Sequence, residues 1–238
     1  MRRRFELVWV LIAATVVVGG CAATTSGTSR GSGIDQQPMY GSIDRQSNAQ
    51  LKAGDVQFIA GVTKEFGSRE KASEMYVEQG IRYYRQDNYS MAMKRFNQAW
   101  LLNSNNPDVY WGFGIIYHDE GKNCEAKQMM DRALGLNLSK LIAIADAARI
   151  YTLCAASNVS LDQGTKSQYF SKSEELYRQA SSISPNNDYI YGSWASALYW
   201  QGKYVEAWEK VAKQRSLGGT PPAQFINLLR AKMSEPKS

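Results

Sequence analysis

Hydrophobic and polar positions divide the chain into three parts. An apolar run of 12 residues, interrupted only by Thr15, extends from Leu7 to Val18 and follows three arginines. Residues 22–47 are rich in Ser, Gly and Thr and contain few apolar residues. From residue 48 onward, apolar and aromatic residues recur at the spacing of amphipathic helices. The pattern predicts a leader, a polar connecting segment and a helical domain.

The helical part repeats itself. Four positions of one segment recur 34 residues later with the same residue types: Gly80, Tyr83, Ala92 and Ala99 match Gly114, Tyr117, Ala126 and Ala133. Glycine and alanine allow two helices to approach closely, and the aromatic residues fill the space between them. The pattern therefore predicts pairs of packed helices in a repeating array.

This period resembles that of the tetratricopeptide repeat, which has two antiparallel helices per unit. The resemblance implies an all-α solenoid with units at about residues 73–106, 107–140, 141–187 and 188–219. The third unit is about 13 residues longer than the others, and we interpret SNVSLDQGTK as an insertion between its helices. The repeat specifies the fold better than the function, because unrelated proteins use it as a binding scaffold.

Helices are also expected on both sides of the array, so that the repeat domain spans residues 48–238. Ser47 and Gln50 form a capping-box pattern before LKAGDVQFIAGVTKEF, which predicts a helix ending at Gly67. Two prolines, Pro221 and Pro222, open a terminal helix over about 221–233. This helix would cover the last repeat.

The leader is typical of a secretory signal peptide over residues 1–20. A membrane-spanning helix needs about 20 apolar residues to cross roughly 30 Å of hydrocarbon, and this run is shorter. A basic start, a short apolar centre and small residues at its end are the marks of a cleaved signal. A polar, flexible tether would then follow over residues 21–47.

The stretch Val18-Gly19-Gly20-Cys21 resembles the lipobox of bacterial lipoproteins. The resemblance implies cleavage before Cys21 and acylation of its thiol, which anchors the protein to a membrane. Ala22 stands where the inner-membrane retention signal would place aspartate, so the periplasmic face of the outer membrane is favoured. An ordinary cleaved signal with a chance cysteine is the alternative.

Charge excludes one class of partner. Removing Arg2, Arg3, Arg4 and Glu6 from the 28 basic and 22 acidic residues leaves 25 and 21, a formal charge of +4. No concentrated basic segment is present in the sequence, so nucleic-acid binding is not expected.

Two cysteines, Cys124 and Cys154, remain after Cys21 is set aside. An oxidising periplasm permits them to pair. Repeat register places both at the same end of the solenoid on adjacent helices, so a disulfide is predicted. Two separate buried thiols are the alternative.

Candidate catalytic chemistry is sparse. His118 is the single histidine, and one histidine without a second histidine or a neighbouring cysteine makes a poor metal site. No glycine-rich loop has phosphate-binding spacing. We therefore expect no metal, no cofactor and no enzyme, and an enzyme using His118 is the least favoured interpretation.

The resemblance also implies a binding groove, because the first helix of each tetratricopeptide unit lines the concave face. The inner positions carried over onto this chain include Val77, Tyr84, Arg85, Trp111, Ile115, His118, Asp119, Arg149, Tyr189, Tyr199 and Trp200. Aromatic residues and arginine are enriched at binding hot spots. The alternative is that some of these rings belong to the core between repeats.

The sequence thus favours a non-enzymatic, membrane-anchored periplasmic scaffold that binds another protein. A pilotin-like assembly factor for a secretin or pilus and an adaptor for cell-wall hydrolases are alternatives that nothing in the sequence separates. Clamping of chaperone C-termini is not favoured, because Val77 and Ile81 stand where that activity uses Lys and Asn. Neither the partner nor the oligomeric state follows from the sequence.

Overall fold

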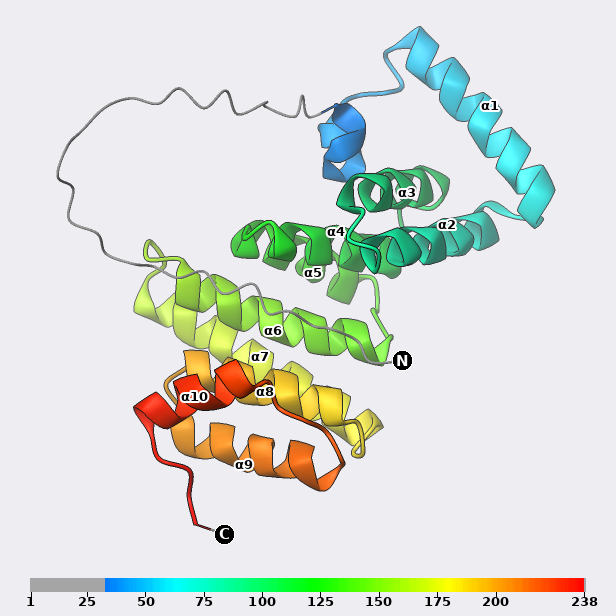
Figure 1. The fold of residues 1–238 in the computed structure, drawn as a ribbon. Helices are drawn as coiled ribbons and strands as arrows, with labels where there is room; N and C mark the ends of the chain where they lie inside the picture. Colours follow the sequence, from blue (N-terminus) through cyan, green and yellow to red (C-terminus); the bar gives the residue numbers. More distant parts are fainter. Residues whose placement is uncertain (1–32, 238) are drawn as a thin grey trace, which may run out of the picture.

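The computed structural model describes residues 33–237, and its regular elements in that range are helices (Figure 1). Two short 3-10 helices come first, followed by α-helices that continue almost to the end of the chain. Their bounds are η1 Ile34–Gln36, η2 Pro38–Ser42, α1 Ala49–Phe66, α2 Arg69–Tyr84, α3 Tyr89–Leu102, α4 Pro107–Asp119, α5 Asn123–Gly135, α6 Leu141–Ser157, α7 Gln163–Ile183, α8 Asp188–Trp200, α9 Tyr204–Ser216 and α10 Ala223–Lys232.

Four helical hairpins stack in chain order, α2 with α3, α4 with α5, α6 with α7 and α8 with α9 (Figure 1). The last three begin at residues 107, 141 and 188, as the repeat predicts. The first begins at Arg69, four residues before the expected start. Ser68 is the reason, because its side chain accepts a hydrogen bond from the Lys71 backbone N–H and so caps the helix there.

Small residues bring these helices together at the predicted Gly80 and Gly114, and also at Gly112, which the repeat pattern did not identify. A Cβ atom added at Gly80 would lie 2.5 Å from the Phe96 ring, and one added at Gly112, on the next unit, would lie 2.4 Å from the same ring. Gly114 faces the Met130 side chain in the same way, at 2.7 Å. Phe96 is completely buried, so the two glycines form the walls that hold it between the first two units.

The third unit differs from the expected form. The residues interpreted as an inserted loop are divided, and only 158–162 lie between helices. Asp162 accepts a hydrogen bond from the Thr165 backbone N–H, which starts α7 at Gln163. The additional length therefore extends α6 to 17 residues and α7 to 21, while the helices of the fourth unit each have 13.

The flanking helices cap both ends of the array. α1 starts after Asn48, whose side chain accepts from the Gln50 and Leu51 backbone N–H groups, so Asn48 and not Ser47 is the cap. α1 ends at Gly67 in the left-handed conformation, as predicted. At the other end, α10 packs on the last hairpin, and Trp208 of α9 donates from its indole N–H to the Met233 carbonyl.

The polar segment before α1 also differs from the expectation. Residues 34–42, assigned to the tether from composition, form η1 and η2 and lie against α3 (Figure 1). The predicted signal peptide, Cys21 and the first part of the tether lie outside the described residues. None of the helices within 33–237 has both the length and the apolar character needed to span a bilayer.

Candidate interaction face

The first helices of the hairpins, α2, α4, α6 and α8, contact one another in succession and form one face of the array. We call this the first-helix face. At its centre lies Asp146 of α6, a buried carboxylate. Asp146 accepts hydrogen bonds from the Trp111 indole N–H of α4 at 3.0 Å and from the Tyr189 hydroxyl of α8 at 2.6 Å. One carboxylate thus joins three consecutive units.

Arg149, one turn further along α6, is poorly paired. Its Nη2 contacts Asp146 Oδ1 at 3.3 Å, a long hydrogen bond for an ion pair. Its Nε is buried and has no hydrogen-bond partner. The side chain is 18% exposed, so the guanidinium is largely withdrawn from water while retaining unused donors. A buried donor without an acceptor is costly in a folded protein, and an oxygen of a bound ligand would remove that cost.

A second carboxylate, Asp119, lies at the end of α4 near two tyrosines. Burial raises the pKa of Asp119, and the Tyr84 hydroxyl of α2 opposes this by hydrogen bonding to the carboxylate. Burial, followed by the charge of Asp119, raises the pKa of Tyr89 to about 12. The rings of Tyr84 and Tyr89 are 5.7 Å apart. Both tyrosines are therefore neutral at physiological pH and present aromatic surface beside an acid.

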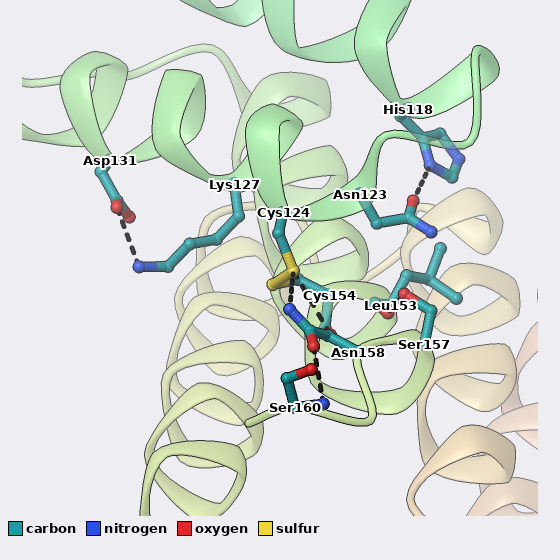
Figure 2. Close-up of a disulfide and its surroundings, with 10 residues drawn as sticks. All are labelled: His118, Asn123, Cys124, Lys127, Asp131, Leu153, Cys154, Ser157, Asn158 and Ser160. Atoms are coloured by element: carbon teal, nitrogen blue, oxygen red, sulfur yellow. Dashed lines mark hydrogen bonds and ion pairs between the residues drawn. A yellow bond between two sulfur atoms is a disulfide. The ribbon is translucent and has the colours of Figure 1, made fainter. Parts of the chain in front are cut away.

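His118 contacts the Asn123 side chain, with its Nδ1 2.9 Å from the amide oxygen (Figure 2). A carbonyl oxygen only accepts, so this contact places a proton on Nδ1. Burial, and then the positive charge of Arg149, lowers the pKa of His118 to about 4. His118 is consequently neutral at pH 7. Its hydrogen-bond partner is an amide, which supplies neither a nucleophile nor a charge to activate the ring.

The structure separates the groove residues expected from sequence into three groups. Tyr84, His118 and Arg149 come together around the Asp146 centre. Val77, Trp111 and Ile115 are core residues, with exposed fractions of 1%, 8% and 3%, so they are not contact residues. Residues three or four positions apart lie on one side of a helix, whether that side packs on a neighbouring helix or faces the open surface. The spacing alone therefore does not distinguish core residues from contact residues.

The remaining expected residues lie at the edges of the face. Arg85 is exposed and follows the last residue of α2. Tyr199 and Trp200 lie at the end of α8, where Tyr199 packs against Tyr204 of α9 and Phe225 of α10. Trp200 is 41% exposed. This aromatic group belongs to the capped end of the solenoid and is separate from the Asp146 centre.

Asp146 and Tyr89 are the residues of this site that the sequence analysis did not identify. Asp146 had a detectable signal, because it and Arg149 are the charged residues of the otherwise apolar segment LIAIADAARI. A charged pair spaced by three residues in a helix that is apolar all round indicates a buried ion pair. Tyr89 starts a second helix, and the repeat pattern gave no reason to place it on this face.

Cys124 of α5 and Cys154 of α6 form a disulfide, with the sulfurs 2.07 Å and the Cα atoms 4.7 Å apart (Figure 2). These are the two cysteines that repeat register placed at the same end of the solenoid. The side-chain amide of Asn158 lies 3.6 Å from Cys124 Sγ. The bond joins the second helix of one unit to the first helix of the next, beside the 158–162 loop.

Within residues 33–237, no group of three or more His, Cys, Asp and Glu side chains is placed to hold a metal ion. Two surface hollows lie away from the Asp146 centre. One, of about 390 Å³, is bounded by α5, α6 and α7 and includes Leu138, Ile144 and Leu176 in its lining. The other, of about 670 Å³, lies between α1 and Arg69.

Comparison with known proteins bears on the fold. No family model matches the sequence, and no curated protein matches it. Among solved structures, a thermophilic tetratricopeptide-repeat protein from Thermus thermophilus superposes with a TM-score of 0.55 at 14% sequence identity, covering 67% of this chain and 80% of that chain. The fold is a tetratricopeptide-repeat solenoid. The first helices of its units form one face of this solenoid, and the Asp146–Arg149 pair lies at the centre of that face.

Proposed function

We propose that this protein is a non-enzymatic scaffold that binds a segment of another protein along the first-helix face. The observation that carries the proposal is Arg149, a largely buried guanidinium with a buried Nε that has no partner. Arginine and tyrosine are the residue types that dominate binding energy at interfaces. Here Tyr84 and Tyr89 lie on the same face, and both are neutral.

Arg149 indicates what part of the partner reaches this centre. Its remaining donors require acceptors, and a carboxylate or a pair of main-chain carbonyl groups supplies them. Asp146 also accepts hydrogen bonds from Trp111 and Tyr189, and it meets the guanidinium in a single contact at 3.3 Å that leaves Nε of Arg149 without a partner. A partner segment that offers oxygen acceptors would complete it.

We further propose that the scaffold is anchored by lipid at Cys21 and faces the periplasm. The apolar run, the small residues before Cys21 and the polar residues after it support anchoring. The Cys124–Cys154 disulfide is compatible with an oxidising compartment. The first-helix face would then be held near a membrane and present a preformed binding surface, which loses little entropy on association.

The test uses a photoreactive amino acid placed in living cells at Arg85, an exposed position at the edge of the face. A second variant carries it at Arg178, an exposed position on α7. We expect a covalent adduct from position 85 and none from position 178. Adding Arg149→Gln to the first variant should reduce the adduct at least about tenfold, the loss typical of a hot-spot contact.

The fold of each variant is checked by its melting temperature. An adduct of equal yield from positions 85 and 178, or one insensitive to Arg149→Gln in a folded protein, would place the partner elsewhere and overturn the proposal. As a matched control, Arg178→Gln combined with the label at position 85 should leave the adduct unchanged.

A further inference from the structure

Residues 34–42 bind to the repeat body much as a separate peptide would. We call residues 34–42 the strap. Asn97 of α3 is completely buried beneath it. The Asn97 side-chain oxygen accepts from the Tyr40 backbone N–H at 3.0 Å, and its nitrogen donates to the carbonyls of Asp35 at 3.0 Å and Gln37 at 2.8 Å. The carboxamide of Asn97 therefore forms hydrogen bonds with three main-chain groups of the strap.

Side chains add a second layer of recognition. Pro38 and Tyr40 are buried, and Arg45 lies over the Tyr40 ring at 4.1 Å. Burial raises the pKa of Tyr40 to about 12. Outside these apolar contacts, Lys94 of α3 lies 3.2 Å from the Asp35 carboxylate. The repeat body thus provides an amide for the main chain and a cation for an acid, and Arg132 of α5 contacts the Met39 sulfur.

The strap does not hold this shape by its own preference. Met39, Tyr40, Gly41 and Ser42 all have left-handed backbone angles, with φ between 52° and 67°. Non-glycine residues are disfavoured in that region, and such a succession would not persist in a free peptide. Contacts with Asn97, Lys94 and Arg132 of the body therefore stabilise a conformation that local preference does not favour. The strap thus resembles a bound peptide, whose conformation is set by the site that binds it.

We infer that the surface of α3 around Asn97 is a peptide-binding site whose resident ligand is the chain's own strap. Because the site reads main-chain groups, it can accept another segment with a carbonyl, a second carbonyl and an N–H spaced as in residues 35, 37 and 40, and a proline and a tyrosine spaced as Pro38 and Tyr40. This site lies on a second helix and is independent of the first-helix face.

The test displaces the strap in the full mature chain and offers a ligand in trans. Pro38→Ala with Tyr40→Ala removes the buried side chains of the strap and leaves the site intact. The probe is a fluorescent synthetic peptide of wild-type residues 33–45, and binding is followed by anisotropy. We expect the strap variant to bind the peptide at least about tenfold more tightly than the wild-type chain, whose resident strap competes at a high effective concentration.

Two controls separate recognition from a change of fold. Asn97→Ala in the strap variant should reduce peptide affinity at least about tenfold, whereas Gln98→Ala, on the same helix and half-buried, should leave it unchanged. A peptide with an N-methylated Tyr40 amide cannot donate to Asn97 and should lose the same tenfold without any change to the protein. Failure of the strap variant to bind the peptide, or equal binding of the methylated peptide, would overturn the inference.

Discussion

At the residue scale, the hydrogen bonds of Asp146 explain why Arg149 is incompletely paired. A carboxylate withdrawn from water needs hydrogen bonds, and Asp146 obtains short ones from Trp111 and Tyr189. Its contact with Arg149 is the longest of the three, at 3.3 Å. The carboxylate is thus satisfied mainly by neutral donors, and the guanidinium remains incompletely paired. Substituting Asp146 would break the bonds to α4 and α8, whereas substituting Arg149 removes one 3.3 Å contact and the Nε that has no partner.

His118 gives the first prediction at this scale. Its pKa of about 4 in the folded protein lies below the ordinary value of 6.5. Well above pH 6.5 the ring is neutral in both states and contributes no pH dependence. As the pH falls from 6.5 to 4 the unfolded chain takes up a proton that the folded protein resists, so stability decreases. Allowing for partial exposure, the loss is on the order of 2–3 kcal/mol.

Urea unfolding at pH 7 and pH 4 measures this loss. Aspartate and glutamate side chains also titrate in the same range, so the informative quantity is the difference between wild type and His118→Gln. The variant should lose about 2 kcal/mol less than wild type over this interval. Equal losses in the two proteins would show that the folded and unfolded states bind the His118 proton equally well.

At the element scale, the disulfide connects α5 to α6 and closes a loop of 30 residues. Cross-linking a loop of this length stabilises a protein by about 3–4 kcal/mol in the chain-entropy estimate. We expect a reductant to lower the free energy of unfolding by that amount, measured by urea titration. Cys124→Ala with Cys154→Ala should be less stable from the start and insensitive to reductant. A wild-type unfolding midpoint that a reductant does not move would contradict the bond.

Helices could be predicted from the sequence where local signals and the repeat agree. The starts at Pro107, Leu141 and Asp188 follow the predicted unit boundaries, and a capping asparagine precedes two of them, at Asn106 and Asn187. The length of α7 was misjudged, because Asp162 begins a helix inside a segment whose composition resembles a loop. A single cap outweighed the composition of the residues around it.

The strap and the Asp146 centre could not be predicted in the same way, since both depend on partners distant in the chain. A polar segment rich in Ser, Gly and Thr carries no sign that Asn97, 57 residues after Tyr40, will bind its main chain. Likewise, helical spacing identified Trp111 as an inner residue but could not distinguish a core position from an open one. Only its bond to Asp146, 35 residues away, shows that its ring is enclosed.

At the scale of the whole molecule, membrane attachment remains a prediction about a residue outside the described range. If Cys21 is acylated, mass spectrometry of the mature N-terminus should show a modified cysteine. Cys21→Ser should block processing or release the protein from the membrane fraction. A mature protein that starts at another residue and is found in the soluble periplasmic fraction would contradict the prediction.

The bonds of Asp146 restrict how an array of this kind can change in evolution. Repeat proteins gain and lose whole units by duplication and deletion, since each unit contacts only its neighbours. Here a carboxylate on α6 is bonded to α4 on one side and to α8 on the other, and the first unit carries Val77 where α4 has Trp111, so it offers no equivalent donor there. Removing the unit of α4 or the unit of α8, or inserting a unit on either side of α6, would leave the buried Asp146 carboxylate without one of its donors. The number of units joined by Asp146 is therefore fixed, and we expect units to be gained or lost only outside them.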